Sequence, residues 1–363
     1  MSENHNDEQK YLLVEFYGTE NHAGSKAKND IVSILSKNGY RPIDPYAFSR
    51  NFIHLDRSGE LRFPFSISKI RGLFYNCLSY LAIKKMYKTL PNNVTLFIQY
   101  PLCHLLGRKN WLVPFFSDFL HKKQITLQVL IHDLEGLRNQ DKQLQMDDLK
   151  FLSLASSVIC HTENMKDWLV SNGIEKNRIK VLYFFDYLHS SKTNLTHQKS
   201  EGIVFAGNLL KSLFLYNKQL PNDITLNLYG NKPDTIDWGK NIRYFGSYAS
   251  DELPSKLVGG WGLVWDGDSV DTCSGCLGEY LKYNSSHKNS LYIVSRLPII
   301  IWSKSALSSY IIENNLGIAV DSLQEIPKKI GEVSEIDYLN MLTNVGMYAT
   351  KLESGQSILS VLP

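Results

Sequence analysis

Charged and hydrogen-bonding side chains crowd the stretch between residues 266 and 288. An apolar strand is predicted just before it, at 262–265, and a helix is predicted to begin near 284–288. In α/β proteins, ligands bind beyond the carboxyl ends of strands, and the free N–H groups at a helix start suit a phosphate. We therefore interpret the stretch as a ligand site, for which a polar surface loop is the alternative. The residues concerned are Asp266, Asp268, Asp271, Glu279, Tyr283, Asn284, His287 and Lys288.

Two other strand ends carry residues suited to chemistry. His132 and Asp133 end a buried strand predicted at 125–133, where an imidazole or a carboxylate can accept a proton. The alternative is that Asp133 caps a helix and that His132 is a structural hydrogen-bonding group. Asn208 and Lys211 lie in a predicted strand-to-helix turn after a strand at 202–207. Lys211 is therefore, in addition to Lys288, a second candidate cation for phosphate binding. A solvated surface charge is the alternative for each lysine.

A polar loop follows the first predicted strand, at 11–17, and precedes a helix predicted over 25–38. Gly24, Ser25 and Lys26 of this region could approach a substrate, although an ordinary strand-to-helix turn has the same composition. The loop contains no GxGxxG pattern, so a dinucleotide-binding fingerprint is not supported.

The composition describes a folded protein of two domains. The chain has 363 residues, 43% of them hydrophobic and 21% charged, with a formal net charge of +3. A chain of this length is longer than a domain with one hydrophobic core usually is, and the net charge is too small to indicate nucleic-acid binding. No apolar run approaches the roughly 18 residues of a membrane span, and the first ten residues are too polar for a signal peptide. The five cysteines are sparse and fit a cytoplasmic location, and the one CxxC, at 273–276, lacks the partners of a zinc site.

Predicted strands alternate with predicted helices along the chain, which indicates parallel sheets. A Ser/Thr-rich stretch at 187–201 is the best linker candidate, and a second strand–helix series follows it. Residues 40–66 are expected to be irregular, and helices are expected at 250–258 and near 335–351. A helix at 68–89 is amphipathic and basic; we interpret it as a core helix, with binding to an anionic membrane as the alternative.

The central stretch resembles bacterial GT-B glycosyltransferases, most closely their galactofuranosyltransferases. The residues that carry the resemblance are GLVWDGDS (262–269), GEYLKYN (278–284) with His287 and Lys288, and LPIIIWSKSAL (297–307). IHDLEGLR (131–138) and FAGNLLKS (205–212) extend it along the chain. A more distant similarity is to the glucosyltransferases that extend glycans on serine-rich adhesins. Two residues depart from the relatives: Ser286 stands where proline is usual, and Arg296 where glycine is common.

The resemblance implies an α/β protein of the GT-B fold, with two doubly wound Rossmann-like domains facing a cleft. The acceptor-side domain is then residues 1–190, the nucleotide-sugar domain is 201–334, and a C-terminal helix in 335–363 crosses back to the first domain. The implied reaction is inverting and metal-independent transfer of galactofuranose from UDP-galactofuranose to a lipid-linked glycan at the inner membrane face. No cofactor is expected beyond the UDP-sugar donor. A weakly held homo-oligomer and peripheral membrane association are further expectations.

The resemblance also assigns roles to the candidate residues. Lys211 and Lys288 would stabilise the leaving diphosphate, and His132 or Asp133 would take the proton of the acceptor hydroxyl. Asp266 and Asp268 could bind a metal ion, but strand-end carboxylates equally accept hydrogen bonds from sugar hydroxyls, and we predict no metal. The remaining donor-binding candidates are Asn208, Tyr229, Glu279, Tyr283, Asn284 and His287, with Tyr229 stacking on uracil as one possibility.

Two other functions remain open at this point. The first keeps the fold and changes the donor to UDP-glucose, as in the adhesin-glycosylating enzymes. The second is a non-catalytic partner subunit that binds a nucleotide sugar without turning it over.

Overall fold

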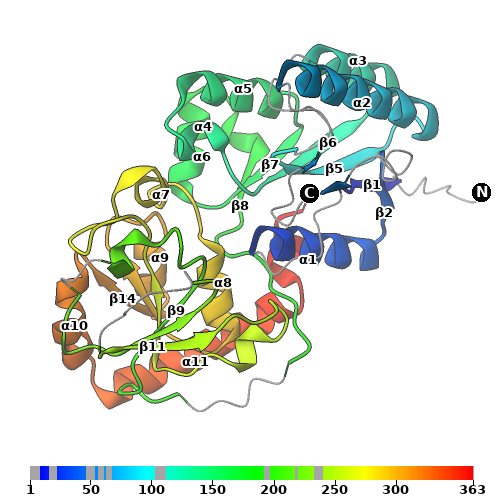
Figure 1. Ribbon diagram of the computed structural model, residues 1–363. Coiled ribbons are helices and arrows are strands. Elements are labelled where there is room, and N and C mark those ends of the chain that lie inside the picture. The colour runs from blue at the N-terminus through cyan, green and yellow to red at the C-terminus, as the bar shows by residue number, and fades with distance from the viewer. Residues whose placement is uncertain are drawn as a thin grey trace, which may run out of the picture.

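A computed structural model gives the fold of the chain. It describes residues 9–15, 23–45, 54–55, 61–62, 68–102, 112–191, 197–216, 220–232 and 240–362. Within these residues the chain forms two α/β domains, each built on a twisted parallel sheet with helices on both faces (Figure 1).

The first sheet has the strand order β2-β1-β5-β6-β7-β8 in the described part of the chain, and every pair is parallel. The strands are β1 (Lys10–Leu13), β2 (Tyr40–Ile43), β5 (Thr95–Tyr100), β6 (Thr126–Ile131), β7 (Ser157–Cys160) and β8 (Ile179–Val181). A small antiparallel pair joins β3 (His54–Leu55) to β4 (Leu61–Arg62). The helices of this domain are α1 (Ala23–Lys37), α2 (Ser68–Thr89), α3 (Val113–Lys123), α4 (Glu135–Arg138), α5 (Lys142–Leu152), α6 (Glu163–Ser171) and the 3₁₀ helix η2 (Lys176–Arg178).

The second sheet has the order β11-β10-β9-β12-β13-β14 and is also parallel throughout. Its strands are β9 (Ile203–Ala206), β10 (Leu226–Tyr229), β11 (Ile242–Gly246), β12 (Trp261–Val264), β13 (Ile299–Trp302) and β14 (Gly317–Val320). Its α-helices are α7 (Gly275–Tyr280), α8 (His287–Val294), α9 (Ser308–Glu313), α10 (Ile326–Glu332), α11 (Glu335–Glu353) and α12 (Gln356–Val361). Its 3₁₀ helices are η3 (Leu213–Tyr216), η4 (Leu253–Ser255) and η5 (Leu323–Glu325).

Both faces of each sheet are buried, because strand side chains alternate between two apolar layers. In β5, Leu96 and Ile98 join the core under α2, α3, α5 and α6. Phe97 points the other way, into a core that it shares with α1. The long apolar sequence runs from which we predicted buried strands are therefore strands whose side chains pack against an apolar layer on each face of the sheet.

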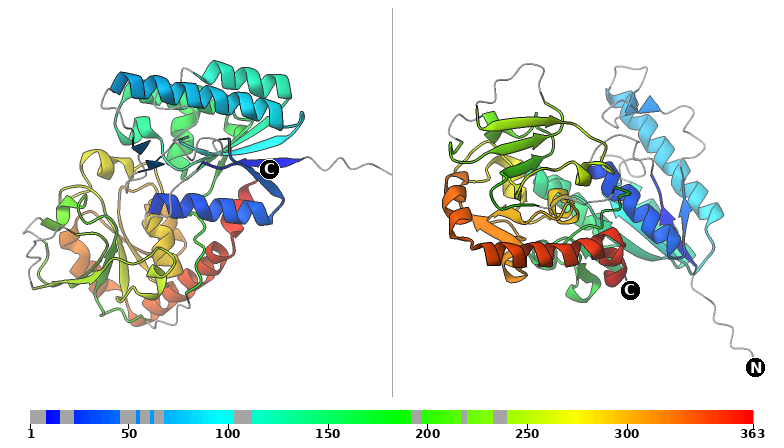
Figure 2. Two further views of the ribbon diagram at one scale, coloured as in Figure 1. Left: turned by 45° about the vertical axis from the view of Figure 1, so that its right-hand side comes forward. Right: turned by 90° about the horizontal axis from the view of Figure 1, so that it is seen from below.

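The chain ends on the first domain. α11 runs along the second domain, and α12 then packs against the first, where Ile358 joins a core with Leu12, Ile31 and Phe97 (Figures 1 and 2). The carboxylate of Asp186 accepts hydrogen bonds from the backbone N–H groups of Ser357 (2.9 Å) and Ile358 (2.8 Å). A buried carboxylate thus holds the first turn of α12.

Two local predictions need correction. Residues 40–43 are not irregular: they form the edge strand β2, in which Pro42 is tolerated because an edge strand need not donate every hydrogen bond. The helix predicted at 250–258 is only the short η4. The hydroxyl of Tyr229 donates to the carbonyl of Lys256 and accepts from the N–H of Val258, so the turn cannot continue as an α-helix.

Two predicted segments extend beyond what the structure describes. The strand predicted at 11–17 is observed as β1, and residues 16–22 lie outside the described part. Residues 192–196 of the predicted linker also lie outside it. In the described part of the chain, no helix is both long and apolar enough to span a bilayer.

Candidate functional site

The predicted ligand loop begins where the second sheet reverses its strand order. β9 lies between β10 and β12, so the chain leaves β9 toward one edge of the sheet and later returns to its other side. Ligands of open α/β sheets bind beyond the carboxyl ends of the strands at such a reversal. Asn208 comes shortly after β9, and Asp266 comes shortly after β12. Both predicted residues therefore lie at the reversal point.

The side chain of Lys288 reaches this point from α8. Its Nζ lies 2.8 Å from Oδ1 of Asp266 and 5.4 Å from the ring centroid of Phe205, in β9. A Cβ atom at Gly207 would lie 3.3 Å from Cε of Lys288, so a larger residue there would crowd the lysine. The Lys288 side chain is 16% exposed. The sheet end thus carries a cation that is held in place yet still reaches solvent.

Polar atoms without a partner gather at the N-terminal end of α8. Ser286 is the N-cap residue, and its hydroxyl accepts a hydrogen bond from the backbone N–H of Lys288. Among the described residues, the buried side-chain atoms here that lack a hydrogen-bond partner are Oδ1 of Asn284, Oγ of Ser285, Nε2 of His287, Oδ1 of Asn289 and Oγ of Ser290. Buried polar groups are nearly always bonded, so such a cluster offers hydrogen-bonding groups that a ligand or an ordered water would satisfy. The helix N-terminus adds positive potential.

Three other predicted residues of the loop make contacts within the protein. The hydroxyl of Ser274 donates to Asp268, and Nζ of Lys282 lies 2.5 Å from Oε2 of Glu279. Tyr283 packs its ring against the core of the first domain. Contact of these three side chains with a ligand stays a prediction.

The turn after β9 has a different conformation from the predicted helix start. Oδ1 of Asn208 accepts a hydrogen bond from the N–H of Leu210 (3.1 Å), and the hydroxyl of Ser212 donates to the carbonyl of Asn208 (3.0 Å). Such side-chain bonds compete with helix formation, and the described chain continues through a turn into η3. Lys211 is exposed on this turn. It therefore lacks the helix N-terminus that the sequence suggested, and its role as a phosphate ligand stays a prediction.

Tyr229 serves the core of the second domain. Its side chain is 1% exposed and stacks on the ring of Phe245 at 5.1 Å, and burial raises the pKa of Tyr229 to about 12. The predicted stacking on a base requires an open ring face, which the structure does not provide.

His132 and Asp133 lie beyond the carboxyl end of β6, on the first domain. Asp133 does not cap a helix, because Leu134 occupies the N-cap position of α4. Its side chain keeps 34% of its surface exposed, and Nη1 of Arg138 lies 3.3 Å from its Oδ2. Loss of water around the carboxylate raises the pKa of Asp133 to about 6, against the opposing effect of Arg138. A carboxylate with this pKa can accept a proton near neutral pH.

The ring of His132 is fixed on both sides. Nε2 of Gln99 donates to the carbonyl of Lys28 (3.1 Å), so Oε1 of Gln99 accepts from Nε2–H of His132 (2.7 Å). This network leaves Nδ1 of His132 unprotonated. Burial lowers the pKa of His132 well below its usual range, so the imidazole is neutral.

Tyr280 joins the ligand loop to the strand end that carries Asp133. Its hydroxyl accepts a hydrogen bond from the N–H of Leu134 (2.8 Å) and lies near the Asp133 carboxylate, whose pKa it lowers. Burial raises the pKa of Tyr280 well above its usual range, so it remains a donor. Sequence reasoning missed this residue, although GEYLKYN contains it, because spacing alone does not show which loop residue reaches the other domain.

Three histidines surround the ring of Phe185 at the boundary between the domains. The centroid distances are 5.0 Å to His132, 4.8 Å to His161 and 5.9 Å to His287. Nε2 of His161 bonds to the carbonyl of Ile131 (2.7 Å), and its Nδ1 accepts from the N–H of Ser285 (3.3 Å). Burial lowers the pKa to about 4 for His161 and about 3 for His287. His161, another residue that sequence reasoning missed, therefore links β7 to the start of α8 as a neutral imidazole.

Gly24, Ser25 and Lys26 lie in the first turn of α1. Nζ of Lys26 lies 2.6 Å from Asp30 and 2.8 Å from Asp251 of the second domain. Gly24 is exposed, with open space where a Cβ would stand. Lys26 therefore ties the two domains together, and contact of this turn with a substrate stays a prediction.

The structure shows how an arginine is accommodated at position 296, where relatives commonly have glycine. Arg296 has φ +63°, in the left-handed region that favours glycine. Its guanidinium forms a two-pronged ion pair with Glu353 of α11, at 2.7 and 3.1 Å. This contact offsets the strain of the conformation.

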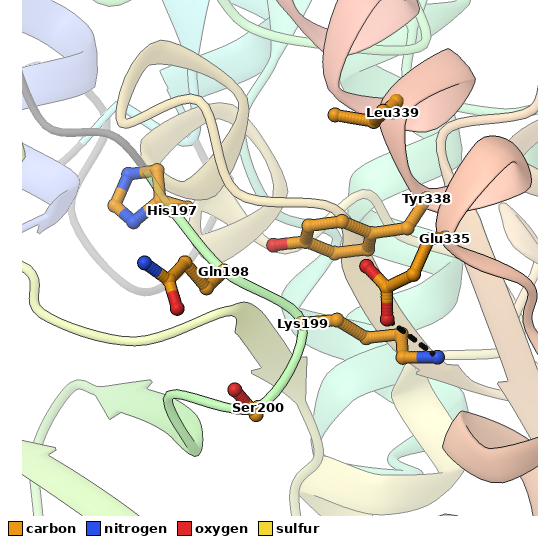
Figure 3. A pocket seen from close by; sticks show the side chains of 7 residues that line it. All are labelled: His197, Gln198, Lys199, Ser200, Glu335, Tyr338 and Leu339. Carbon is orange, nitrogen blue, oxygen red and sulfur yellow. Dashed lines mark ion pairs between the residues drawn. The ribbon is translucent and has the colours of Figure 1, made fainter.

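A pocket of about 340 Å³ lies at the opposite end of the second sheet and does not belong to this site. The residues that line it are His197, Gln198, Lys199, Ser200, Glu335, Tyr338 and Leu339 (Figure 3). Lys199 pairs with Glu335 at 3.1 Å, and the hydroxyl of Tyr338 donates to the carbonyl of Gly260 just before β12. These polar groups are bonded to protein, so the pocket offers little for a ligand to recognise.

No group of three His, Cys, Asp or Glu residues in the described part of the chain is placed to hold a metal ion. Asp266 pairs with Lys288, and Asp268 accepts from Ser274. Metal independence of the reaction stays a prediction.

Family models match both domains of the chain. The model described as "Glucosyltransferase 3-like, N-terminal domain" matches residues 10–183, and the corresponding C-terminal domain model matches residues 203–362. Together they span both sheets.

Three proteins illustrate the similarity. The beta-1,6-galactofuranosyltransferase WbbI of Escherichia coli K12 is 32% identical over 300 residues, which are 80% of this chain and 84% of the relative. Glucosyltransferase 3 of Streptococcus gordonii is 27% identical over 66% of this chain and 70% of the relative. The crystal structure of Anabaena Alr3699/HepE in complex with UDP-glucose superposes with a TM-score of 0.56 over 97% of this chain and 100% of that chain, at 12% identity.

The first prediction concerns the histidines around Phe185. Because the pKa of His161 falls from 6.5 to about 4 on folding, the unfolded chain binds the proton first, and stability is lost as pH falls from 6.5 toward 4. Between pH 6.5 and 5, this loss should be about 2 kcal/mol. His161→Gln should lower the free energy of unfolding at pH 7 by about 1–2 kcal/mol through its lost hydrogen bonds, but should not show this further loss.

Urea unfolding of the two proteins at pH 7 and pH 5 measures the effect. Parallel pH dependences in wild type and variant would contradict the assignment of His161 as a buried neutral imidazole.

Proposed function

This chain belongs to the glucosyltransferase 3-like family of GT-B glycosyltransferases, and from that premise we propose that it transfers galactofuranose from UDP-galactofuranose to a hydroxyl group of a lipid-linked glycan precursor. The observation that carries the proposal is the placement of Lys288, at the reversal point of the second sheet and in the first turn of α8. The choice of sugar follows the similarity to the galactofuranosyltransferase of E. coli, and the uridine nucleotide follows HepE. A cytoplasmic location, at the membrane that carries such an acceptor, is part of the proposal.

Lys288 and the start of α8 would bind the diphosphate of the donor. As the bond between the sugar and the diphosphate breaks, negative charge grows on the leaving phosphate, and a fixed cation stabilises that charge. Asp266 holds Nζ of Lys288 before the donor binds. The unpaired side-chain atoms of residues 284–290 would supply further hydrogen bonds to the donor. Because these groups provide the charge and the hydrogen bonds, we expect no metal ion to be required.

Asp133 is the proposed base. Its carboxylate would take the proton of the acceptor hydroxyl while that oxygen attacks the anomeric carbon opposite the leaving diphosphate, which inverts the configuration there. Arg138 holds the carboxylate and partly balances its charge, and the nearby Tyr280 hydroxyl lowers its pKa. His132 is the second candidate, because its Nδ1 is unprotonated.

A second candidate function keeps the mechanism and changes the sugar. Both family models are named for glucosyltransferase 3, and the streptococcal relative carries the same name. These observations favour a UDP-glucose-dependent enzyme that extends a glycan already attached to a serine-rich adhesin.

A donor panel tests the proposal. Thermal unfolding is followed with UDP, UDP-galactofuranose, UDP-galactopyranose and UDP-glucose, each with added Mg²⁺ or with EDTA. We expect all uridine nucleotides to stabilise the protein, UDP-galactofuranose most, with equal shifts in Mg²⁺ and EDTA. A ligand at 100 times its Kd stabilises by about 2.7 kcal/mol, which such an assay resolves.

The other outcomes are equally specific. A larger shift and faster transfer with UDP-glucose would replace the first function by the second. Binding of UDP without transfer to any acceptor would support a non-catalytic subunit. The absence of any shift with uridine nucleotides would reject both transferase proposals.

Replacing Lys288 tests the proposed diphosphate site. Lys288→Ala should lower kcat/KM by about 100-fold, because one charged contact to the leaving group is lost. Lys282→Ala is the matched control: Lys282 lies in the same loop but pairs with Glu279, and its loss should change kcat/KM by less than about threefold. Steady-state kinetics with UDP release as the readout checks both. Wild-type turnover in Lys288→Ala would remove the lysine from the mechanism.

The pH dependence of the reaction tests the base. Only the ionised form of Asp133 accepts a proton, so kcat/KM should rise with pH through about 6, the pKa of this carboxyl. The Tyr280 hydroxyl near the carboxylate lowers that pKa, so Tyr280→Phe should move the acidic limb of the profile to higher pH. Asp133→Asn should lower kcat by about 100-fold or more.

The result also distinguishes the two candidate bases. If His132 is the base, Asp133→Asn keeps most of the activity, and Tyr280→Phe leaves the acidic limb where it is in the wild type.

A further inference from the structure

α2 and α3 expose a row of large apolar side chains. The inner side of α2 is buried, with Ala82, Ile83 and Met86 in the core. On its outer side Tyr80 is 41% exposed, Leu81 47% and Tyr87 41%, and Phe115 of α3 is 47% exposed. The rings of Tyr80 and Phe115 meet edge to face at 5.7 Å. We name the surface formed by Tyr80, Leu81, Lys84, Tyr87, Lys88 and Phe115 the outer face.

The outer face is positively charged. The part of α2 whose side chains the structure describes, residues 77–89, contains three lysines and no acidic residue, whereas the whole chain has a net charge of only +3. Lys84 and Lys88 are exposed one turn apart, between the apolar residues. On α3, Asp118 is paired with Lys122 at 2.8 Å, so it adds no net negative charge there. The face thus combines aromatic rings, an aliphatic side chain and unbalanced lysines.

The outer face lies at the edge of the first domain, away from the second. Figure 1 and the left view of Figure 2 show α2 and α3 side by side on the far side of the first sheet from the second domain. A flat surface could therefore meet these helices without touching α7, α8 or the strand ends of the second sheet.

We propose that the outer face docks on an anionic membrane surface. Tyrosine and phenylalanine rings enter the headgroup region readily, and exposed lysines beside them are attracted to anionic lipids. A second copy of the chain is a poorer occupant, because it would bring Lys84 and Lys88 of both copies into contact. Only the biological role of the docking rests on the proposed function. Docking would bring the first domain, which carries Asp133, to the lipid-linked acceptor.

Vesicle sedimentation with the full chain tests the docking. The probes are vesicles of phosphatidylcholine alone and vesicles with about 30% phosphatidylglycerol. We expect binding to the anionic vesicles only, and weaker binding when salt rises from about 0.1 M to 0.5 M. Lys84→Gln with Lys88→Gln should weaken binding by about 30-fold, since each lysine near a charged surface contributes about fivefold. Tyr80→Ser with Leu81→Ser should weaken it by about tenfold or more.

Matched controls lie on two other helices. Ile336 and Leu339 are exposed on α11, and Lys328 is exposed on α10; Ile336→Ser with Leu339→Ser, and Lys328→Gln, should bind vesicles as the wild type does. Unfolding temperature confirms that each variant is folded. The lysine variant changes only exposed side chains and keeps the test valid if the apolar variant fails to fold.

Three results would overturn the inference. They are equal binding to neutral and anionic vesicles, wild-type binding by the lysine variant, and a smaller oligomer in solution for Tyr80→Ser with Leu81→Ser, which would make the face an interface between copies. Failure of docking is distinguishable from failure of the proposed function, because stabilisation by UDP-sugars and transfer to a soluble acceptor are measured without vesicles.

Discussion

The hydroxyl of Tyr280 connects the two halves of the candidate site. It accepts a hydrogen bond from the N–H of Leu134 in the first domain and lies near the carboxylate of Asp133, while its own helix, α7, belongs to the loop that carries Asp266. A buried tyrosine cannot move without breaking the hydrogen bond of its hydroxyl. The position of the candidate base is therefore set by the same loop that begins at the candidate donor site.

The domain boundary is built from groups that stay neutral or are ion-paired. His132, His161 and His287 surround Phe185 with lowered pKa values, while Lys26 contacts Asp30 and Asp251. Unpaired charge in such a place would cost several kcal/mol, so neutral imidazoles are the polar groups that fit beside an aromatic ring. The unbonded polar atoms at the start of α8 are the exception. They lie beside this boundary, where the physical argument for a ligand is strongest.

Much of the fold could be predicted, because apolar runs and turns report on buried parallel strands. Those runs placed Asp266 after a strand and Lys288 at a helix start, as observed, whereas the strand order, and with it the reversal point of the second sheet, comes from the structure. The failures have a common physical cause, which is competition from distant groups. The Tyr229 hydroxyl ends the helix predicted at 250–258 and is itself buried in doing so. His161 and Tyr280 matter through contacts between residues more than 120 positions apart, which periodicity cannot reveal.

The position of α12 has a consequence for how the protein is made. The core of the first domain contains Ile358 beside Leu12, Ile31 and Phe97, and the buried carboxylate of Asp186 accepts hydrogen bonds from the N–H groups of Ser357 and Ile358. Domains usually fold in the order in which the ribosome releases them. Here the core of the first domain stays incomplete until the whole second domain has been synthesised. The domain that starts the chain is thus the last to be completed.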